Sequence, residues 1–187
     1  MICIMNFSIA QGRKQLNKRI FITNGMARCG KDTFAKCLNE ITPTMKYSSI
    51  DKVKDIARLC GWEGGKTERD RKFLSDLKLL TTDYSDMPFK EIKKKVEKFM
   101  SDKTYEVMLI DIREPEEIER AKTVFGAKAI LIENNNVKHI SSNMADANVY
   151  NYKYDYVIQN NGTLEEFKEN IEKFYRSILE EEDGDRK

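Results

Sequence analysis

The chain has 187 residues, enough for one domain with a substantial core, and its 33 basic and 31 acidic residues nearly balance. Neither the net charge of +2 nor the apolar segments, all shorter than the roughly 18 residues of a membrane span, indicate a nucleic-acid or membrane partner. The four cysteines form no Cys-x-x-Cys pair, so we expect reduced thiols in a cytoplasmic protein.

Short, mostly apolar segments alternate along the chain with longer stretches of helical periodicity. Strands are expected at 19–23, 105–112, 127–132 and 154–158, with a weaker candidate at 45–50. Helices are expected at about 31–41, 51–60, 67–85, 89–101, 115–125 and 163–181. Continuous apolar strands between helices are typical of a parallel sheet that is buried on both faces. The pattern predicts one α/β domain at 19–180, preceded by a loosely ordered arm at 1–18 and followed by a charged tail at 181–187.

The segment "GMARCGKDT" at 25–33 has the spacing of a phosphate-binding loop, G-x-x-x-x-G-K. It follows the apolar run "IFIT" and precedes a helical pattern. A phosphate loop requires a strand before it and a helix after it, because the loop N–H groups and the helix N-terminus form the anion site together. Lys31 is expected to reach the β- and γ-phosphate oxygens of a nucleotide, and Thr33 an α-phosphate oxygen. The residues expected to bind ATP in this loop are Gly25, Met26, Ala27, Arg28, Cys29, Gly30, Lys31, Asp32 and Thr33.

Asp32 stands where the loop pattern has Ser or Thr, whose hydroxyl binds Mg²⁺. A carboxylate is a better ligand than a hydroxyl for this hard, oxygen-seeking ion, so we expect Asp32 to hold Mg²⁺. Its charge would repel the triphosphate without the metal, which predicts that nucleotide binding depends steeply on Mg²⁺. The helix dipole alone also favours an acid in the first helical turn, and the two interpretations are compatible.

The segment "VMLIDIREPEEIERAK" places Asp111 at the end of an apolar strand and Arg113 two residues later, so both point to one side. The carboxyl ends of parallel strands border the crevice where such sheets bind ligands. We therefore expect Asp111 to be the second metal-binding carboxylate and Arg113 to offset charge on the transferring phosphoryl group. The alternative is a local ion pair that caps the strand.

Basic residues between 66 and 72 precede an apolar stripe of Phe73, Leu77 and Leu80. Arg69 lies one turn before Phe73 on the same helix face, so it is expected to point into a cleft together with Arg71. The alternative is a solvated, charged helix. By analogy of fold, residues after the second strand are also expected to bind the acceptor. The predicted acceptor-binding residues are Ser48, Ser49, Lys52, Arg69, Arg71 and Arg113.

Three short segments resemble one known family. "GMARCGKDTFA" has a G-K-D-T loop, "DIREPEE" is similar to D-V-R-F-P-N-E, and "DYVIQNNGTLEEF" is similar to D-Y-V-I-D-N-N-G-T-L-E. These are motifs of the phage-type deoxynucleoside monophosphate kinases and, for the loop, more distantly of the animal phosphomevalonate kinases. The resemblance implies that Asn160, Asn161 and Gly162 contact the adenine base. The single His139 departs from the family pattern around it and receives no catalytic role.

The resemblance and the order of elements together predict a P-loop kinase. Its fold would be a three-layer α/β sandwich of about five parallel strands in the order 2-3-1-4-5, with helices on both faces. We expect γ-phosphoryl transfer from ATP with Mg²⁺ to a (deoxy)nucleoside monophosphate, by a monomer or homodimer, with Lys31, Arg113 and Arg69 as catalytic cations. No general base is required, because a phosphate oxygen is already nucleophilic. The alternatives are a kinase for a non-nucleotide phosphate, such as phosphomevalonate or dephospho-CoA, and a regulatory protein that binds nucleotide without catalysis.

Overall fold

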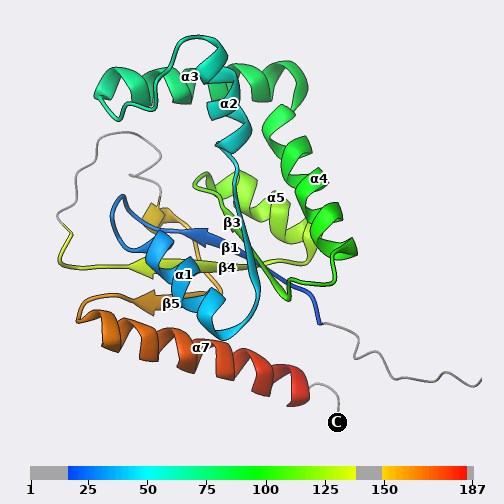
Figure 1. The fold of residues 1–187 in the computed structure, drawn as a ribbon, viewed down its shortest axis with the longest axis vertical. Coiled ribbons are helices and arrows are strands. Elements are labelled where there is room, and N and C mark those ends of the chain that lie inside the picture. The colour runs from blue at the N-terminus through cyan, green and yellow to red at the C-terminus, as the bar shows by residue number, and fades with distance from the viewer. Residues whose placement is uncertain (1–16, 138–148, 185–187) are drawn as a thin grey trace, which may run out of the picture.

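A computed structural model describes residues 17–137 and 149–184, so most of the expected arm and His139 lie outside the described residues. Five strands form one parallel sheet in the order β2-β3-β1-β4-β5, which confirms the predicted fold class (Figure 1). The weak candidate at 45–50 is the edge strand β2. The strands are β1 (Arg19–Asn24), β2 (Thr44–Ser48), β3 (Val107–Asp111), β4 (Lys128–Glu133) and β5 (Tyr156–Gln159).

Helices cover both faces of the sheet, as the sequence predicts. On one face lie α1 (Lys31–Ile41) and α7 (Leu164–Gly184), and on the other lie α4 (Met87–Ser101) and α5 (Pro115–Phe125). Two further helices of the described residues, α2 (Asp51–Leu59) and α3 (Glu68–Ser85), pack on each other and on α4, and α3 lies away from the sheet (Figure 1). A short 3₁₀ helix, η1 (Val149–Asn151), precedes β5 and was not predicted.

Two hydrophobic clusters hold the three layers together. Phe21 and Leu109 face α1 and α7, while their neighbours Ile22 and Ile110 face α4 and α5. Successive side chains of a strand point to opposite faces, so a sheet covered on both sides needs apolar residues at every position. This double burial explains why the strands appear in the sequence as continuous apolar runs.

The apolar stripe of α3 is buried less than its spacing predicts. Leu74 is the buried residue of this helix, Phe73 and Leu77 are half-buried, and Leu80 is 65% exposed. Because α3 packs on two helices and not on the broad surface of the sheet, it needs only a narrow apolar face. The predicted stripe is therefore confirmed in part at Phe73 and Leu77, is wrong at Leu80, and missed Leu74.

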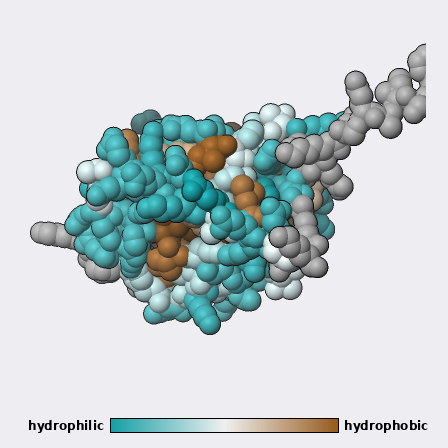
Figure 2. All heavy atoms as spheres, turned by 90° about the horizontal axis from the view of Figure 1, so that it is seen from below, coloured by the Kyte–Doolittle hydropathy of each residue, from teal (hydrophilic) through white to brown (hydrophobic). Residues whose placement is uncertain are grey.

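Helix α7 continues through Gly184, three residues past its expected end at 181. The Arg19 guanidinium donates two hydrogen bonds of 2.7 Å to the carboxylate of Glu182, which ties the last turns of α7 to the start of β1. The molecule seen from the side of α7 is mostly hydrophilic, with small separate hydrophobic patches (Figure 2). None of the helices in the described part of the chain is both long and apolar enough to cross a membrane.

Candidate active site

The loop between β1 and α1 is a tight turn that only glycine permits at two positions. Gly25 has a φ of 147° and Gly30 a φ of 108°, where side chains are strained. A Cβ at Gly25 would lie 2.6 Å from the sulfur of Cys29, and one at Gly30 would collide with the side-chain amide of Asn160. The first turn of α1 begins directly at Lys31. This backbone fits a phosphate, because a bare loop and a helix N-terminus supply N–H donors without side chains in the way.

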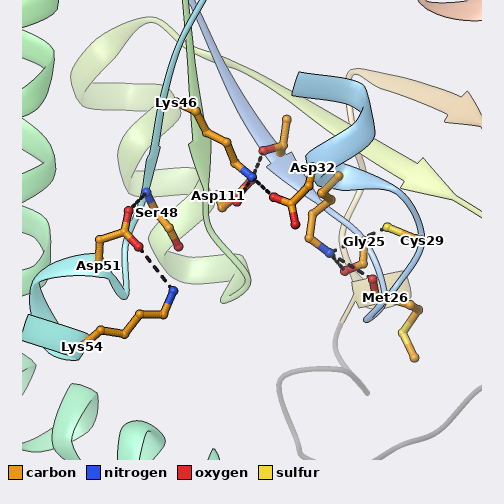
Figure 3. A network of polar contacts seen from close by, with 11 residues as sticks. Gly25, Met26, Cys29, Asp32, Lys46, Ser48, Asp51, Lys54 and Asp111 are labelled. Carbon is orange, nitrogen blue, oxygen red and sulfur yellow. Dashed lines mark hydrogen bonds and ion pairs between the residues drawn. The ribbon is translucent and has the colours of Figure 1, made fainter. Parts of the chain in front are cut away.

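The side chain of Lys31 folds back along the same loop. Its Nζ donates hydrogen bonds to the carbonyl oxygens of Gly25, at 2.5 Å, and Met26, at 3.0 Å (Figure 3). Burial lowers the pKa of Lys31, the charge of Arg113 lowers it further, and the thiol of Cys29 and the carboxylate of Asp111 oppose that shift. The predicted common role of Lys31, Arg113 and Asp111 at one phosphate stays a prediction.

Asp32 and Asp111, the two predicted metal ligands, meet at one cation in the structure. The ammonium of Lys46 forms ion pairs with Asp32 Oδ1 and, at 3.0 Å, with Asp111 Oδ2 (Figure 3). Thr23 Oγ1 donates to the other oxygen of Asp111 at 2.5 Å, which fixes the carboxylate. The hydrogen bond and the charge of Lys46 hold the pKa of Asp32 below its ordinary value.

This pair of carboxylates fits Mg²⁺. The ion prefers oxygen ligands and is usually held by one or two carboxylates together with substrate phosphates and water. Within residues 17–137 and 149–184, no group of three or more His, Cys, Asp or Glu side chains is arranged to hold a metal by itself. Asp32 and Asp111 would therefore share Mg²⁺ with the phosphates of a nucleotide in the adjoining loop.

Asn24, which the sequence analysis missed, connects the loop with the segment after β3. Its side chain is fully buried, accepts a hydrogen bond from Gly25 N at 2.8 Å, and donates to the Arg113 carbonyl at 3.2 Å and to Tyr154 Oη at 2.7 Å. Tyr154 Oη in turn donates to the Val149 carbonyl at 2.8 Å. The sequence did contain a signal for Asn24, because it is a polar residue at the end of an apolar strand and directly before the loop. Asn24 therefore joins the backbone at the start of the loop to the backbone at Arg113.

The loop at 160–162 lies beside the phosphate loop. Asn160 Nδ2 donates to the Cys29 carbonyl at 2.8 Å, so this amide supports the phosphate loop directly. Asn161 is exposed, and its side-chain oxygen accepts from Asn135 N at 2.7 Å in the segment after β4. Gly162 is also exposed. The expected contact of these three residues with adenine stays a prediction.

The segment after β2 contributes a second set of polar groups next to Asp111. The backbone N–H of the buried Ser49 donates to the Asp111 carbonyl at 3.1 Å, and its Oγ accepts from Lys78 Nζ at 3.4 Å. Lys78 also forms a 2.6 Å ion pair with Glu117, and these two side chains are only 18% and 15% exposed. Nothing in the sequence distinguished Lys78 from the solvated lysines of its charged helix.

The remaining predicted acceptor residues lie farther out. Ser48 N donates to Oδ2 of Asp51, the first residue of α2, at 2.9 Å, and Lys52 is exposed in the first turn of that helix. Arg69 and Arg71 are exposed in the first turn of α3, just after the capping box that begins it. Their part in the site stays a prediction.

No protein-family model and no curated protein matches the chain. Among solved structures, a dephospho-CoA kinase from Campylobacter jejuni is 18% identical with a TM-score of 0.51, over 86% of this chain and 97% of that one. TT1252 from Thermus thermophilus is 16% identical with a TM-score of 0.46, over 88% and 98% of the chains. A shikimate kinase from Bacteroides thetaiotaomicron is 15% identical with a TM-score of 0.41, over 87% and 98%. The likeness to the first of these supports the P-loop kinase fold, and the resemblance to the deoxynucleoside monophosphate kinases stays a prediction.

Proposed function

We propose that this protein transfers the γ-phosphoryl group of ATP, with Mg²⁺, to a small phosphorylated acceptor, and that this acceptor is a (deoxy)nucleoside monophosphate. One observation carries the proposal. The glycine-bounded loop with Lys31 lies at the same edge of the sheet as the converging carboxylates of Asp32 and Asp111. Phosphoryl transfer needs this combination of a phosphate cradle, a metal site and cations.

Each group near the loop has a role in this reaction. The loop N–H groups would bind the nucleotide phosphates, and Lys31 would exchange its two loop carbonyls for phosphate oxygens. Asp32 and Asp111 would hold Mg²⁺, which neutralises charge on those oxygens when it is bound. Arg113, whose carbonyl is held by Asn24, would offset charge on the group in transfer.

An acceptor that itself carries a phosphate would need positive charge near Asp111. Lys78 is nearly buried and already paired with Glu117, so that charge would come from the predicted contacts of Arg69, Arg71 and Arg113. An anionic phosphate oxygen needs no general base, so positioning and electrostatics suffice. The nucleoside part of the acceptor rests on the resemblance of the three sequence motifs.

The test is ADP release from Mg²⁺ and ATP against a panel of acceptors. The panel holds the common ribo- and deoxyribonucleoside monophosphates, phosphomevalonate, and the dephospho-CoA for which the Campylobacter enzyme is named. We expect one nucleoside monophosphate to raise turnover far above background. Lys31→Ala should lose at least about 100-fold, as when one transition-state donor is removed, while the exposed Lys36→Ala in the same helix should not.

Other results would change the proposal in defined ways. Turnover with phosphomevalonate or dephospho-CoA alone would keep the kinase and replace the acceptor class. Tight ATP binding with every acceptor silent would favour a regulatory nucleotide-binding protein. Equal turnover of the wild type and Lys31→Ala would contradict the role of the loop.

A further inference from the structure

We infer that Lys46 is a built-in counter-ion for the metal site: its ammonium holds the carboxylates of Asp32 and Asp111 together until a divalent metal ion displaces it. The inference rests on the proposed function only in treating these two carboxylates as metal ligands. It assigns a role to a residue that lies outside the phosphate loop and outside the motifs of the sequence.

The register of the sheet explains how Lys46 reaches this point. β2 pairs in parallel with β3, so that Lys46 lies opposite Leu109 and Ser48 lies opposite Asp111. Lys46 therefore starts two residues before the end of the strands, and its long side chain extends to their carboxyl edge. Figure 3 shows its ammonium between the carboxylates of Asp111 and Asp32.

The contacts are those of one cation shared by two carboxylates. Lys46 Nζ lies 3.0 Å from Asp111 Oδ2 and also binds Asp32 Oδ1. The side chains of Lys46 and Asp111 are 30% and 19% exposed, whereas that of Asp32 is 88% exposed. Thr23 occupies the other oxygen of Asp111, so Oδ2 is the atom that faces the cation. The two acids come from the start of α1 and the end of β3, and only the fold brings them together.

Charge makes the ammonium and a metal ion mutually exclusive at this place. Two carboxylates directed at one point repel each other, and a single ammonium leaves one negative charge uncompensated. A divalent ion would neutralise both acids. Like charges about 4 Å apart repel each other strongly at the partly exposed edge of a protein, so Mg²⁺ and the ammonium of Lys46 would not bind the two carboxylates at the same time. The metal affinity of the protein should reflect competition with its own lysine.

A neighbouring lysine provides a matched control. Lys54 forms a 3.3 Å ion pair with Asp51, three residues earlier in α2, and is not the lysine that pairs with Asp32 and Asp111 (Figure 3). Removing its charge changes the net charge of the protein as much as removing that of Lys46. Any difference between the two variants therefore comes from position.

The first experiment measures Mn²⁺ binding by electron paramagnetic resonance, without nucleotide or acceptor. We expect Lys46→Met to bind Mn²⁺ at least about tenfold more tightly than the wild type, because a positive charge has left the site. Lys46→Arg and Lys54→Met should match the wild type, and adding Asp111→Asn to Lys46→Met should abolish the gain. Binding by Lys46→Met that is equal to the wild type, weaker, or undetectable would overturn the inference.

A second measurement uses the wild-type protein, so it does not depend on the folding of a variant. Reductive methylation with and without Mg²⁺, followed by mass spectrometry, reports how accessible each lysine amine is. We expect Mg²⁺ to increase the modification of Lys46 several-fold and to leave Lys54 unchanged. No increase at Lys46 would contradict the displacement. Neither experiment needs ATP or an acceptor, so a silent acceptor panel would leave this inference standing, and its failure would leave the kinase proposal standing.

Discussion

Replacement of Asn24 by alanine should destabilise the protein strongly, although the residue lies in none of the recognised motifs. Its fully buried side chain makes three hydrogen bonds, to Gly25 N, the Arg113 carbonyl and Tyr154 Oη. A typical intramolecular hydrogen bond contributes about 1 kcal/mol net, and a buried group left without a partner costs at least as much. Asn24→Ala should therefore lower the free energy of unfolding by about 3 kcal/mol.

Tyr154→Phe is the matched variant, because it removes only the hydroxyl that bonds to Asn24 and to the Val149 carbonyl. Burial raises the pKa of Tyr154 to about 12, so this hydroxyl stays protonated at neutral pH. We expect a loss of about 1 to 2 kcal/mol from Tyr154→Phe, and a double variant less destabilised than the sum by about 1 kcal/mol. Urea denaturation followed by circular dichroism measures all three. A loss below about 1 kcal/mol for Asn24→Ala, or strict additivity, would refute this reasoning.

Three further predictions concern two ion pairs and the loop between β1 and α1. Lys78→Met should lower the free energy of unfolding by about 1 to 3 kcal/mol in urea denaturation, because it leaves the nearly buried Glu117 carboxylate without this partner. A second change of Glu117→Gln should recover part of that loss. Arg120 donates hydrogen bonds of 2.8 and 2.6 Å to Asp86 and holds the pKa of Asp86 below its ordinary 3.8. This stabilisation is complete above the unfolded-state pKa and is lost as the pH falls through the lowered folded-state pKa, so Asp86→Asn should flatten the acid side of the stability curve; an unchanged slope would exclude the ion pair as its source. Gly30→Ala should lower the free energy of unfolding by about 1 to 2 kcal/mol, because the backbone at Gly30 is left-handed. It should also weaken ATP binding measured by calorimetry, and an affinity equal to that of the wild type would show that the loop tolerates a side chain.

Much of the fold follows from local patterns in the sequence. The continuous apolar strands predicted a sheet covered on both faces, and Ile22 and Phe21 do pack into opposite clusters. The loop between β1 and α1 is also predictable from a local pattern, because its glycines, Lys31 and the following helix are contiguous in the sequence. Each of these features needs only the conformation of its own segment and the element directly next to it.

The partners of individual polar side chains were decided only by the tertiary structure. Lys46 and Lys78 look like ordinary solvated lysines in the sequence, yet one lies between Asp32 and Asp111 and the other is nearly buried against Glu117. Periodicity indicates which way a side chain points relative to its own strand or helix, but not which distant element comes to meet it. The contacts of Lys46 with Asp32 and Asp111 exist because strand register and helix placement bring separate segments to one edge of the sheet.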